Sequence, residues 1–462
     1  MRWFPLGHAM WLAEAGSLRV LFDPLLDDLH HGGVFRVWPP RRVHPEALRA
    51  DFILVSHRHP DHFDVPSLRR LAAIDPESVV VTPDPLVEEA ARAVGFRTVH
   101  RTAPGQRVEL DGLTLVTTPS QGSDEWGAAL CDPSGLVWNM VDTTFSAPAA
   151  AKAVRDGLCR ATGRPGVDLL LARWQPLREV DAALGGTLGF PLEAYGRTLD
   201  EVAGVGARAV VPTAAGVVHA APYEAMNALV YPVPESRFLA DVTARQPGLR
   251  AFPCRTGGCF TVDPDGCTLD PTGGASLVTV LPSGDDPRVF RPFGLGPLVD
   301  PGPVEALPAL RDALDAWMCG AVRAALPTGG APLRYVAEVV YPGGTRDAWT
   351  FLAGDGSCRV SRSFEPDWDL LVQCPASLLG DVLAGRRGWG DPLLGGMLRA
   401  ASRAYGASPA GLRGRRRSPL FLYYALPYDE SERRAVRWQL EGRGGGSRCG
   451  ADAAGATELR RG

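Results

Sequence analysis

The sequence is short of lysine and of net positive charge, and these two shortages bear on its partners. Lys152 is the single lysine among 48 basic residues, which we interpret as the arginine bias of a high-GC genome. The formal net charge is −4 and the sequence pI about 6.2. Because a positive field supplies most non-specific affinity for nucleic acid, DNA and RNA are not expected as partners.

Paired cysteines and long apolar runs are also missing. The nine cysteines are odd in number and contain no CxxC pair, which favours a reducing cytoplasm over a disulfide framework. The first residues, Met1–His8, contain no long apolar run and lead directly into a strand pattern. We therefore expect no signal peptide and no membrane span, and a cytoplasmic location.

What is present is the composition of a soluble globular protein. Hydrophobic residues make up 45% and charged residues 22% of the 462 positions, enough for about two domains. From Trp3 to about Val262, short β-branched runs alternate with helical stretches, which predicts a layered α/β fold. The expected strands are 19–22, 52–55, 78–82, 113–117, 137–141, 167–171 and 209–211, and the expected helices are 65–73 and 86–94, the latter closed by Gly95.

A stretch rich in proline and glycine, residues 264–303, predicts a connector between two domains. Beyond it the pattern predicts an α+β domain, and then a Gly/Arg-rich tail that we expect to be disordered. The predicted units are 1–263, 264–303, 304–440 and 441–462. Within the second domain we expect helices at 304–326, 375–384 and 391–405, and strands at 335–341, 349–352 and 368–373.

A histidine-rich turn carries the strongest chemical signal. The buried-strand pattern Asp51–Val55 runs directly into Ser56-His57-Arg58-His59-Pro60-Asp61-His62. Three imidazoles and a carboxylate within six residues, held at the end of a strand, can converge on a small volume. Imidazole and carboxylate suit zinc, iron or manganese. The spacing therefore predicts a metal site, with His57 and His59 pointing the same way and Asp61 and His62 serving a neighbouring position.

This HxHxDH pattern after a strand resembles the metallo-β-lactamase superfamily, and the similarity spans about residues 5–225. The segments Gly7–Met10 and Leu18–Pro24 resemble the branch that contains ascorbate-lactone hydrolases and the CMP-N-acetylneuraminate hydroxylase. Three further segments favour the hydroxylase: Trp138–Asp142, Gly189–Pro191, and Val211–Gly216 leading to His219. The resemblance implies an αββα sandwich with a pair of metal ions.

The resemblance also implies a set of ligands. It places His57 and His59 on one metal, Asp61 and His62 on the other, Asp142 as the catalytic bridge between both, and His219 on the second metal. Asp142 follows the apolar run Leu136–Val141, where a second strand should deliver the bridging anion that two close cations need. A turn role for Asp142 and a surface position for His219 stay open as alternatives.

One histidine of the family pattern is missing. Where it belongs, the chain has Thr118–Trp126, in which Gln121 aligns best, while Asp124 or Glu125 could supply an oxygen instead. An oxygen donor in place of an imidazole favours iron over zinc, and similar diiron oxygenases of this fold carry an oxygen ligand there. His8 could lie near the metals, although a structural role is the favoured interpretation.

The C-terminal half resembles, more faintly, a sterol-carrier-like α+β domain over about residues 305–430. That resemblance implies an apolar tunnel for a large hydrophobic substrate, and the alternative is a dimerisation or packing domain with a filled core. Arg386, Arg387 and Arg413–Arg417 could hold the phosphates of a coenzyme A thioester or a nucleotide conjugate. For Arg413–Arg417, the alternative interpretation is a solvated, charged loop.

The sequence thus predicts a non-haem diiron monooxygenase with two Fe ions and O₂ as cosubstrate. Diterpenoid-hydroxylating diiron enzymes of the platensimycin pathway are a further resemblance, and they imply a hydrophobic, terpenoid-like small-molecule substrate, with a coenzyme A thioester as one form. Because the chain lacks the CxH and CxxH pattern of a Rieske cluster, electrons are expected from an external donor such as a ferredoxin and its reductase. The alternatives are a dizinc hydrolase of a lactone, phosphodiester or thioester, and a metal-stabilised lipid-binding protein.

Overall fold

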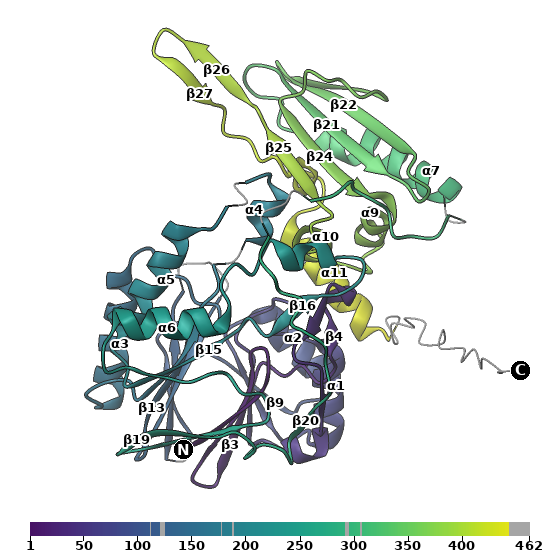
Figure 1. Ribbon diagram of the computed structural model, residues 1–462. Helices are drawn as coiled ribbons and strands as arrows, with labels where there is room; N and C mark the ends of the chain where they lie inside the picture. Colours follow the sequence, from purple (N-terminus) through teal and green to yellow (C-terminus); the bar gives the residue numbers. More distant parts are fainter. Residues whose placement is uncertain are drawn as a thin grey trace, which may run out of the picture.

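The structure is a computed structural model that describes residues 1–110, 112–120, 125–176, 178–186, 189–291, 295–304 and 307–442. Two large sheets lie face to face in its N-terminal part (Figure 1). The first has the order β19 (Gly266–Asp270), β18 (Cys259–Asp263), β1 (Arg2–Gly7), β2 (Met10–Ala15), β3 (Leu18–Phe22), β7 (Phe52–Leu54), β8 (Val79–Thr82) and β9 (Thr98–Arg101). The second has the order β10 (Arg107–Leu110), β11 (Leu113–Thr118), β12 (Gly127–Asp132), β13 (Gly135–Asn139), β14 (Leu169–Arg173), β15 (Ala209–Thr213) and β17 (Arg250–Ala251).

Helices cover the outer face of each sheet. The first sheet packs on α1 (Val65–Ile74) and α2 (Pro85–Val94), and the second on α3 (Pro148–Thr162), α5 (Leu192–Val205) and α6 (Glu235–Arg245). Successive side chains of β2 alternate between the two interfaces, with Trp11 in the core between the sheets and Met10 in the core under the helices. This arrangement confirms the predicted αββα sandwich.

Local chemistry explains where the first two helices begin and end. The carboxylate of Asp64 accepts a hydrogen bond from the backbone N–H of Ser67 and so caps α1, and Asp84 caps α2 through Leu86 in the same way. Gly95 ends α2 in the left-handed conformation, at φ 116°, where a side chain would be strained. The expected C-cap is confirmed.

Smaller elements complete the N-terminal part. β16 (Val217–His219) joins β5 (Phe35–Val37) and β4 (Leu29–His30), and β20 (Val278–Val280) pairs with β6 (Arg41–Val43). Short helices are η1 (His31–Gly33), η2 (Pro45–Leu48), η3 (Glu224–Ala228) and α4 (Glu179–Ala183). Because β19 and β20 both lie within 264–303, this segment, expected as a connector, contributes strands to the N-terminal sheets, and the exact domain boundaries stay a prediction.

The C-terminal part is a separate five-stranded sheet with helices on one face (Figure 1). Its strand order is β23 (Ser357–Ser361), β22 (Arg346–Gly354), β21 (Leu333–Val340), β24 (Leu370–Pro375) and β25 (Arg399–Ser402), and a projecting hairpin is formed by β26 (Tyr405–Ser408) and β27 (Gly411–Gly414). The helical elements are α7 (Leu307–Trp317), a π-helical turn η5 (Met318–Val322), α8 (Arg323–Ala325), α9 (Ala376–Leu383), α10 (Gly390–Leu394), η6 (Phe421–Tyr424) and α11 (Tyr428–Leu440).

Large aromatic side chains fill the core of this C-terminal part. Tyr335, Trp349, Phe351 and Phe421 are all fully buried in one cluster. A cavity of about 850 Å³ lies beside this core and is lined in part by Leu310, Leu314 and Leu378, so the tunnel and the packing domain both stay predictions. The likeness to sterol-carrier domains stays a prediction.

The expected helix 391–405 is wrong beyond its first turn. α10 ends at Leu394, and the chain then passes through Gly395 and Gly396 into β25 and β26. Gly396 has φ 67°, which a helix does not accommodate, and the small residues after it pair with β24 as a strand. The tertiary pairing therefore overrides the local helical pattern.

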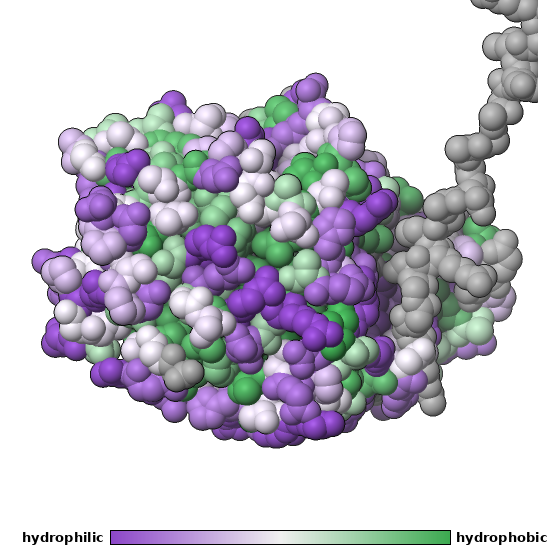
Figure 2. Space-filling view, turned by 90° about the horizontal axis from the view of Figure 1, so that it is seen from below, coloured by the Kyte–Doolittle hydropathy of each residue, from purple (hydrophilic) through white to green (hydrophobic). Residues whose placement is uncertain are grey.

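The two parts meet through α10 and α11. α11 packs on α1 and α2, and the guanidinium of Arg69 donates a hydrogen bond of 2.9 Å to the carbonyl of Gln439. In the described part of the chain, no helix is both long enough and apolar enough to cross a membrane. Of the expected tail, 441–462, the residues from 443 on lie outside the described part of the chain. On the face seen in Figure 2, hydrophilic and hydrophobic residues are interspersed.

Candidate metal centre

The histidine turn lies at the carboxyl end of β7, in the middle of the first sheet. β7 runs parallel to both β3 and β8, so the ends of these strands meet at one edge. Asp23 follows β3 directly, and its carboxylate accepts hydrogen bonds from the backbone N–H and the hydroxyl of Ser56 at 2.7 and 2.9 Å. The end of one strand thus anchors the turn that follows its neighbour.

Two of the imidazoles are oriented by hydrogen bonds on the ring edge away from the centre. Nδ1 of His62 lies 2.9 Å from Oδ2 of Asp23, and Nδ1 of His57 lies 2.9 Å from the hydroxyl of Ser56. These contacts leave Nε2 of both rings facing inward, which is how outer partners orient metal-ligating histidines. Asp23 and Ser56 are functional candidates whose role the sequence pattern did not indicate.

The inward atoms of the turn converge as the spacing predicts. Nε2 of His57 lies 2.9 Å from Nδ1 of His59, and Nε2 of His62 lies 3.4 Å from Oδ2 of Asp61. Ring nitrogens and carboxylate oxygens are thereby brought close together, which is the arrangement that a bound cation stabilises.

Asp142 reaches the same point from the second sheet. It follows β13, and its Oδ2 lies 3.0 Å from Nε2 of His62 and 3.9 Å from Nε2 of His57. His57, His62 and Asp142 together offer ligand atoms that all lie within 4.8 Å of one another. One carboxylate oxygen between the two imidazoles is the position that a bridging ligand requires.

A second group of ligand atoms includes a residue outside the predicted set. Nε2 of His8, in the turn between β1 and β2, lies 3.2 Å from Oδ2 of Asp61. His8, Asp61 and His62 offer ligand atoms within 4.8 Å of one another. His8 belongs to the segment Gly7–Met10 of the family resemblance, and its position after a strand is the sequence signal for it.

The structure does not bring His219 to this cluster. β16 pairs with β5, opposite Phe35, and Nε2 of His219 lies 3.1 Å from the carbonyl oxygen of Leu394. This pairing directs the ring toward α10, so His219 connects β16 to the C-terminal part. His8, rather than His219, lies beside Asp61 and His62.

Glu125 is the described residue among the three candidates for the missing ligand, and it lies in the wall of the same cavity. It precedes β12 and lines one cavity together with Asp142 and His59. Burial, together with the charge of Asp142, raises the pKa of Glu125 to about 7, and its Oε2 is buried with no hydrogen-bond partner among the residues described. Gln121 and Asp124, the other candidates for this position, lie outside the described residues.

The electrostatics of the centre fit cations. Burial and the neighbouring His62 hold the pKa of His57 well below its usual value, so this imidazole is neutral, the form that binds metal. Burial opposes protonation of His62, but the carboxylates of Asp61 and Asp142 outweigh it and hold the pKa of His62 well above normal. Four imidazoles and three carboxylates around one point form a metal-binding site, and its high oxygen content suits iron or manganese at least as well as zinc.

Residues with strained backbone conformations are concentrated around the same point. Among the described residues other than glycine, six have positive φ, and four of them flank the ligands: His8 (52°), Asp23 (42°), Val141 (50°) and Ala214 (57°). Such conformations are costly for side-chain-bearing residues and persist where the surrounding fold holds them, which is common at functional sites.

The metal centre opens into a cavity of about 340 Å³. Leu393, Leu394 and Tyr428 from the C-terminal part line it, together with Phe35 and Val217 from the N-terminal part. This volume lies at the lower end of the range of volumes found for small-molecule binding sites. The C-terminal part therefore forms one wall of the cavity.

The chain is similar in sequence to several known proteins. A family model described as beta-lactamase superfamily domain matches residues 18–145. A UPF0173 metal-dependent hydrolase of Opitutus terrae is 32% identical over 178 residues, which are 37% of this chain and 71% of that protein. A Mycolicibacterium smegmatis protein named for a Rieske 2Fe-2S iron–sulfur centre is 28% identical over 228 residues, 45% of this chain, and the chain spans 42% of its length.

Among solved structures, the diiron β-hydroxylase CmlA of Streptomyces venezuelae is similar with a TM-score of 0.37 and 17% identity, covering 55% of this chain and 53% of that one. The specific resemblance to the CMP-N-acetylneuraminate hydroxylase stays a prediction. The sandwich, the metal-binding turn and the Opitutus relative together place the chain in one family. The chain belongs to the metallo-β-lactamase superfamily.

Proposed function

We propose that the chain is a non-haem diiron monooxygenase that hydroxylates a largely apolar small molecule. The observation that carries this proposal is the carboxylate of Glu125, which lines the same cavity as Asp142 and belongs to the segment where the family pattern has a histidine. With Asp61 it gives the centre three carboxylates. Oxygen-rich ligand sets favour iron over zinc.

The chain's own residues hold and shield the two ions. His57, His59 and Glu125 would bind one ion, Asp61, His62 and His8 the other, and Asp142 both. When bound, the ions would supply the activation of O₂. Asp23 keeps His62 turned toward the centre through the 2.9 Å contact with Nδ1.

The walls of the cavity bind and orient the substrate. Phe35, Leu393 and Leu394 present apolar surface beside the ligands, which excludes water and favours a hydrophobic molecule. A terpenoid-like compound is our candidate, free or as a coenzyme A thioester. The reaction consumes the substrate C–H group, one O₂, two electrons and two protons, and forms the alcohol and one water.

The two electrons come from an external donor under this proposal, such as a ferredoxin and its reductase. The Mycolicibacterium relative is named for a Rieske 2Fe-2S centre, whereas this chain has no CxH and CxxH pattern. A separate electron-transfer protein would take that role. We further propose that the chain forms a homodimer.

A dizinc hydrolase is the second candidate, because the Opitutus relative is named a metal-dependent hydrolase. In that case the ions would activate water for attack on a lactone, phosphodiester or thioester.

Metal-loaded samples separate the two functions. The chain reconstituted anaerobically with Fe²⁺ should consume O₂ when a reduced ferredoxin supplies electrons, and the Glu125→Ala variant should lose most of that uptake. The zinc-loaded chain should not hydrolyse bis(p-nitrophenyl) phosphate or simple lactones. Fast hydrolysis by the zinc form, with no oxygen uptake by the iron form, would establish the hydrolase instead.

A further inference from the structure

We propose that Arg58 is a positioning residue for the metal centre, and that it fixes His57 and His59 by anchoring the turn between them to Asp84. The inference rests on the metal centre of the proposed function, but on neither iron nor a particular substrate. Arg58 stands between the two histidines in the sequence. Its guanidinium has only donor groups and so cannot itself bind a cation.

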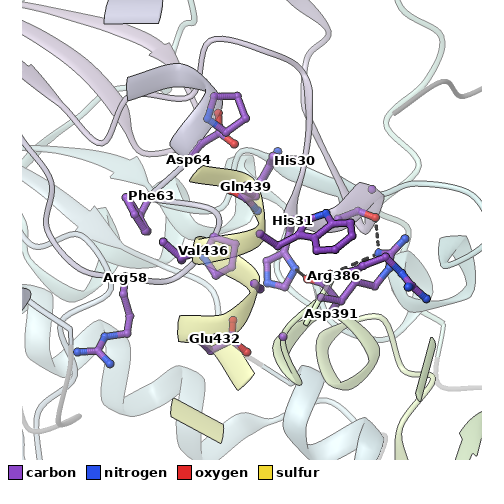
Figure 3. A pocket seen from close by; sticks show the side chains of 18 of the residues that line it. His30, His31, Arg58, Phe63, Asp64, Arg386, Asp391, Glu432, Val436 and Gln439 are labelled. Carbon is purple, nitrogen blue, oxygen red and sulfur yellow. Dashed lines mark hydrogen bonds and ion pairs between the residues drawn. The ribbon is translucent and has the colours of Figure 1, made fainter. Parts of the chain in front are cut away.

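The side chain of Arg58 lies on the other side of the turn from the metal cavity. His59 lines the cavity of about 340 Å³ that contains Asp61 and Asp142. Arg58 does not line that cavity, and instead lines a separate one of about 580 Å³ to which both parts of the molecule contribute (Figure 3). Arg58 can therefore act on the ions only through the backbone of the turn.

Arg58 and Asp84 form a bidentate ion pair. Nε of Arg58 donates a hydrogen bond to Oδ2 of Asp84 at 2.6 Å, and Nη2 donates one to Oδ1 at 3.1 Å. The two side chains are 11% and 5% exposed. Two parallel hydrogen bonds fix the direction of a guanidinium as well as its distance, so this pair holds residue 58 in one place.

Asp84 is itself fixed by the sheet and by a helix. It lies two residues beyond the end of β8, the parallel neighbour of β7, which leads into the turn. Its Oδ1 also accepts a hydrogen bond of 2.8 Å from the backbone N–H of Leu86, at the start of α2. On the other side of β7, Asp23 after β3 holds Ser56 and His62. One carboxylate from each flanking strand therefore clamps the turn.

His59 is the ligand that depends most on this anchor. His57 and His62 are each oriented by a hydrogen bond on the outer edge of the ring. In the part of the chain that the structure describes, the His59 ring has a single hydrogen-bond contact, the 2.9 Å one to Nε2 of His57. Because no outer partner orients its ring, the position of His59 depends on the backbone beside it, which Arg58 fixes.

A further contact of Arg58 provides an internal comparison. Nη1 lies 3.8 Å from Oδ1 of Asp429, on α11 of the C-terminal part, and the side chain of Asp429 is 64% exposed. Long, exposed ion pairs contribute little, because water screens them. The position of the turn should therefore depend on Asp84 and not on Asp429.

The affinity of the full-length chain for zinc tests the anchor. Zinc has no redox chemistry, so its binding depends on the ligands and not on oxygenation. Affinities for the two Zn²⁺ ions are measured by competition with the chromogenic chelator 4-(2-pyridylazo)resorcinol. Arg58→Met keeps the aliphatic stem and removes the guanidinium, and Asp84→Ser removes the carboxylate while it keeps a good N-cap for α2.

Each variant should weaken one Zn²⁺ ion about tenfold, as loss of a group that orients ligands does, and should change the affinity for the other ion by no more than about threefold. The double variant should be no weaker than the weaker single variant, because both changes remove the same contact. Arg58→Lys, which keeps the charge without the bidentate geometry, should fall between wild type and Arg58→Met.

Two control variants should bind both ions as wild type does. Asp429→Ala removes the exposed partner of the same arginine. Arg208→Met breaks an ion pair with Asp168 of 3.1 Å, which lies just before β14 and β15, at the ends of these strands away from the metals.

Three results would overturn the anchor: wild-type zinc affinity in Arg58→Met or Asp84→Ser, an equal loss at both ions, or losses that multiply in the double variant. An equal loss is what a purely structural role would give. If Arg58→Met does not fold, Arg58→Lys with Asp84→Ser provides the same comparison. Failure of the diiron proposal would appear differently, as iron-loaded protein that consumes no O₂ while the selective loss of zinc affinity persists.

Discussion

At the scale of single residues, the centre depends on which carboxylates reach the imidazoles of the turn. Asp142 comes from the second sheet and places one oxygen 3.0 Å from His62. Glu125 precedes the neighbouring strand β12 and enters the same cavity. A pair of cations needs a shared anion to offset their mutual repulsion. We therefore give Asp142 the role of the shared ligand and Glu125 the role of a ligand to one ion.

Replacing Asp142 tests the bridging role. In Asp142→Ala the two cations lose their shared ligand, so metal content should fall from two ions per chain to one or none, and activity should be lost. Inductively coupled plasma mass spectrometry measures the content. The Asp241→Ala variant, whose carboxylate pairs with Arg237 on the outer helix α6, should keep both ions. Two ions retained in Asp142→Ala would remove this residue from the centre.

Exchanging the oxygen donor tests metal preference. Glu125→His restores an imidazole at the first metal, so the ratio of zinc to iron bound from an equimolar mixture should rise at least severalfold. Gln121→His serves as the matched comparison and should leave the ratio as in the parent. The reverse pattern would assign the position to Gln121.

Part of this centre could be predicted from the sequence, because neighbours along the chain fix the local geometry. The HxHxDH turn follows a buried strand, and the spacing alone brings His57 and His59 together. Asp23 could not be identified as a partner of the turn, and for His8 a structural role was the favoured prediction, because the proximity of both depends on the strand order β1-β2-β3-β7. Such long-range pairing has no periodic signal in one sequence.

At the scale of elements, the turn between β1 and β2 is held against the segment that precedes β16. A Cβ added to Gly216 would lie 2.7 Å from both the backbone N and Cα of His8. Real side chains do not tolerate such contacts with backbone atoms. Gly216 therefore permits the close approach that brings His8 to Asp61.

Substituting this glycine tests how the second metal is positioned. Gly216→Ala should displace His8, lower the metal content toward one ion, and destabilise the fold by roughly 1–3 kcal/mol, as measured by calorimetry and metal analysis. Gly166→Ala is the control, since no atom lies within 4 Å of its added Cβ. Unchanged metal content in Gly216→Ala would show that His8 is not a ligand.

Element prediction failed where pairing outside the segment decides the conformation. The helix predicted at 391–405 was wrong after Leu394. Gly395 and Gly396 end the helix, and residues 399–402 then pair with β24 as a strand. The sandwich was predictable, since its strands are buried on both faces and form continuous apolar runs.

At the scale of the whole molecule, the two parts meet at a charged contact beside a second cavity of about 580 Å³ (Figure 3). Nδ1 of His31, in the N-terminal part, lies 2.5 Å from Oδ1 of Asp391, in the C-terminal part. Glu432 of α11 lines the same cavity, and its Oε1 accepts a hydrogen bond of 3.0 Å from the backbone N–H of Gly390. This contact supports α10, whose leucines close the metal cavity.

Glu432 makes stability depend on pH. Burial raises its pKa from 4.5 to about 7, so between these values the folded chain holds a proton that the unfolded chain has lost. Stability therefore falls as pH rises through this window. Glu432→Gln removes the effect, and the variant should match wild type at pH 5 and exceed it at pH 8 by on the order of 2 kcal/mol.

Chemical denaturation at the two pH values measures this difference. Glu430→Gln on the same helix is the control, because Glu430 is partly exposed beside Arg434 and should give no pH-dependent gain. A wild-type chain as stable as Glu432→Gln at pH 8 would contradict a protonated Glu432 at the contact.

Mössbauer spectroscopy of the chain reconstituted anaerobically with ⁵⁷Fe²⁺ tests whether the centre holds a pair of iron ions. We expect two ferrous sites per chain, which become a coupled diferric pair after exposure to O₂. Iron bound at less than one ion per chain, or as isolated mononuclear sites, would contradict it.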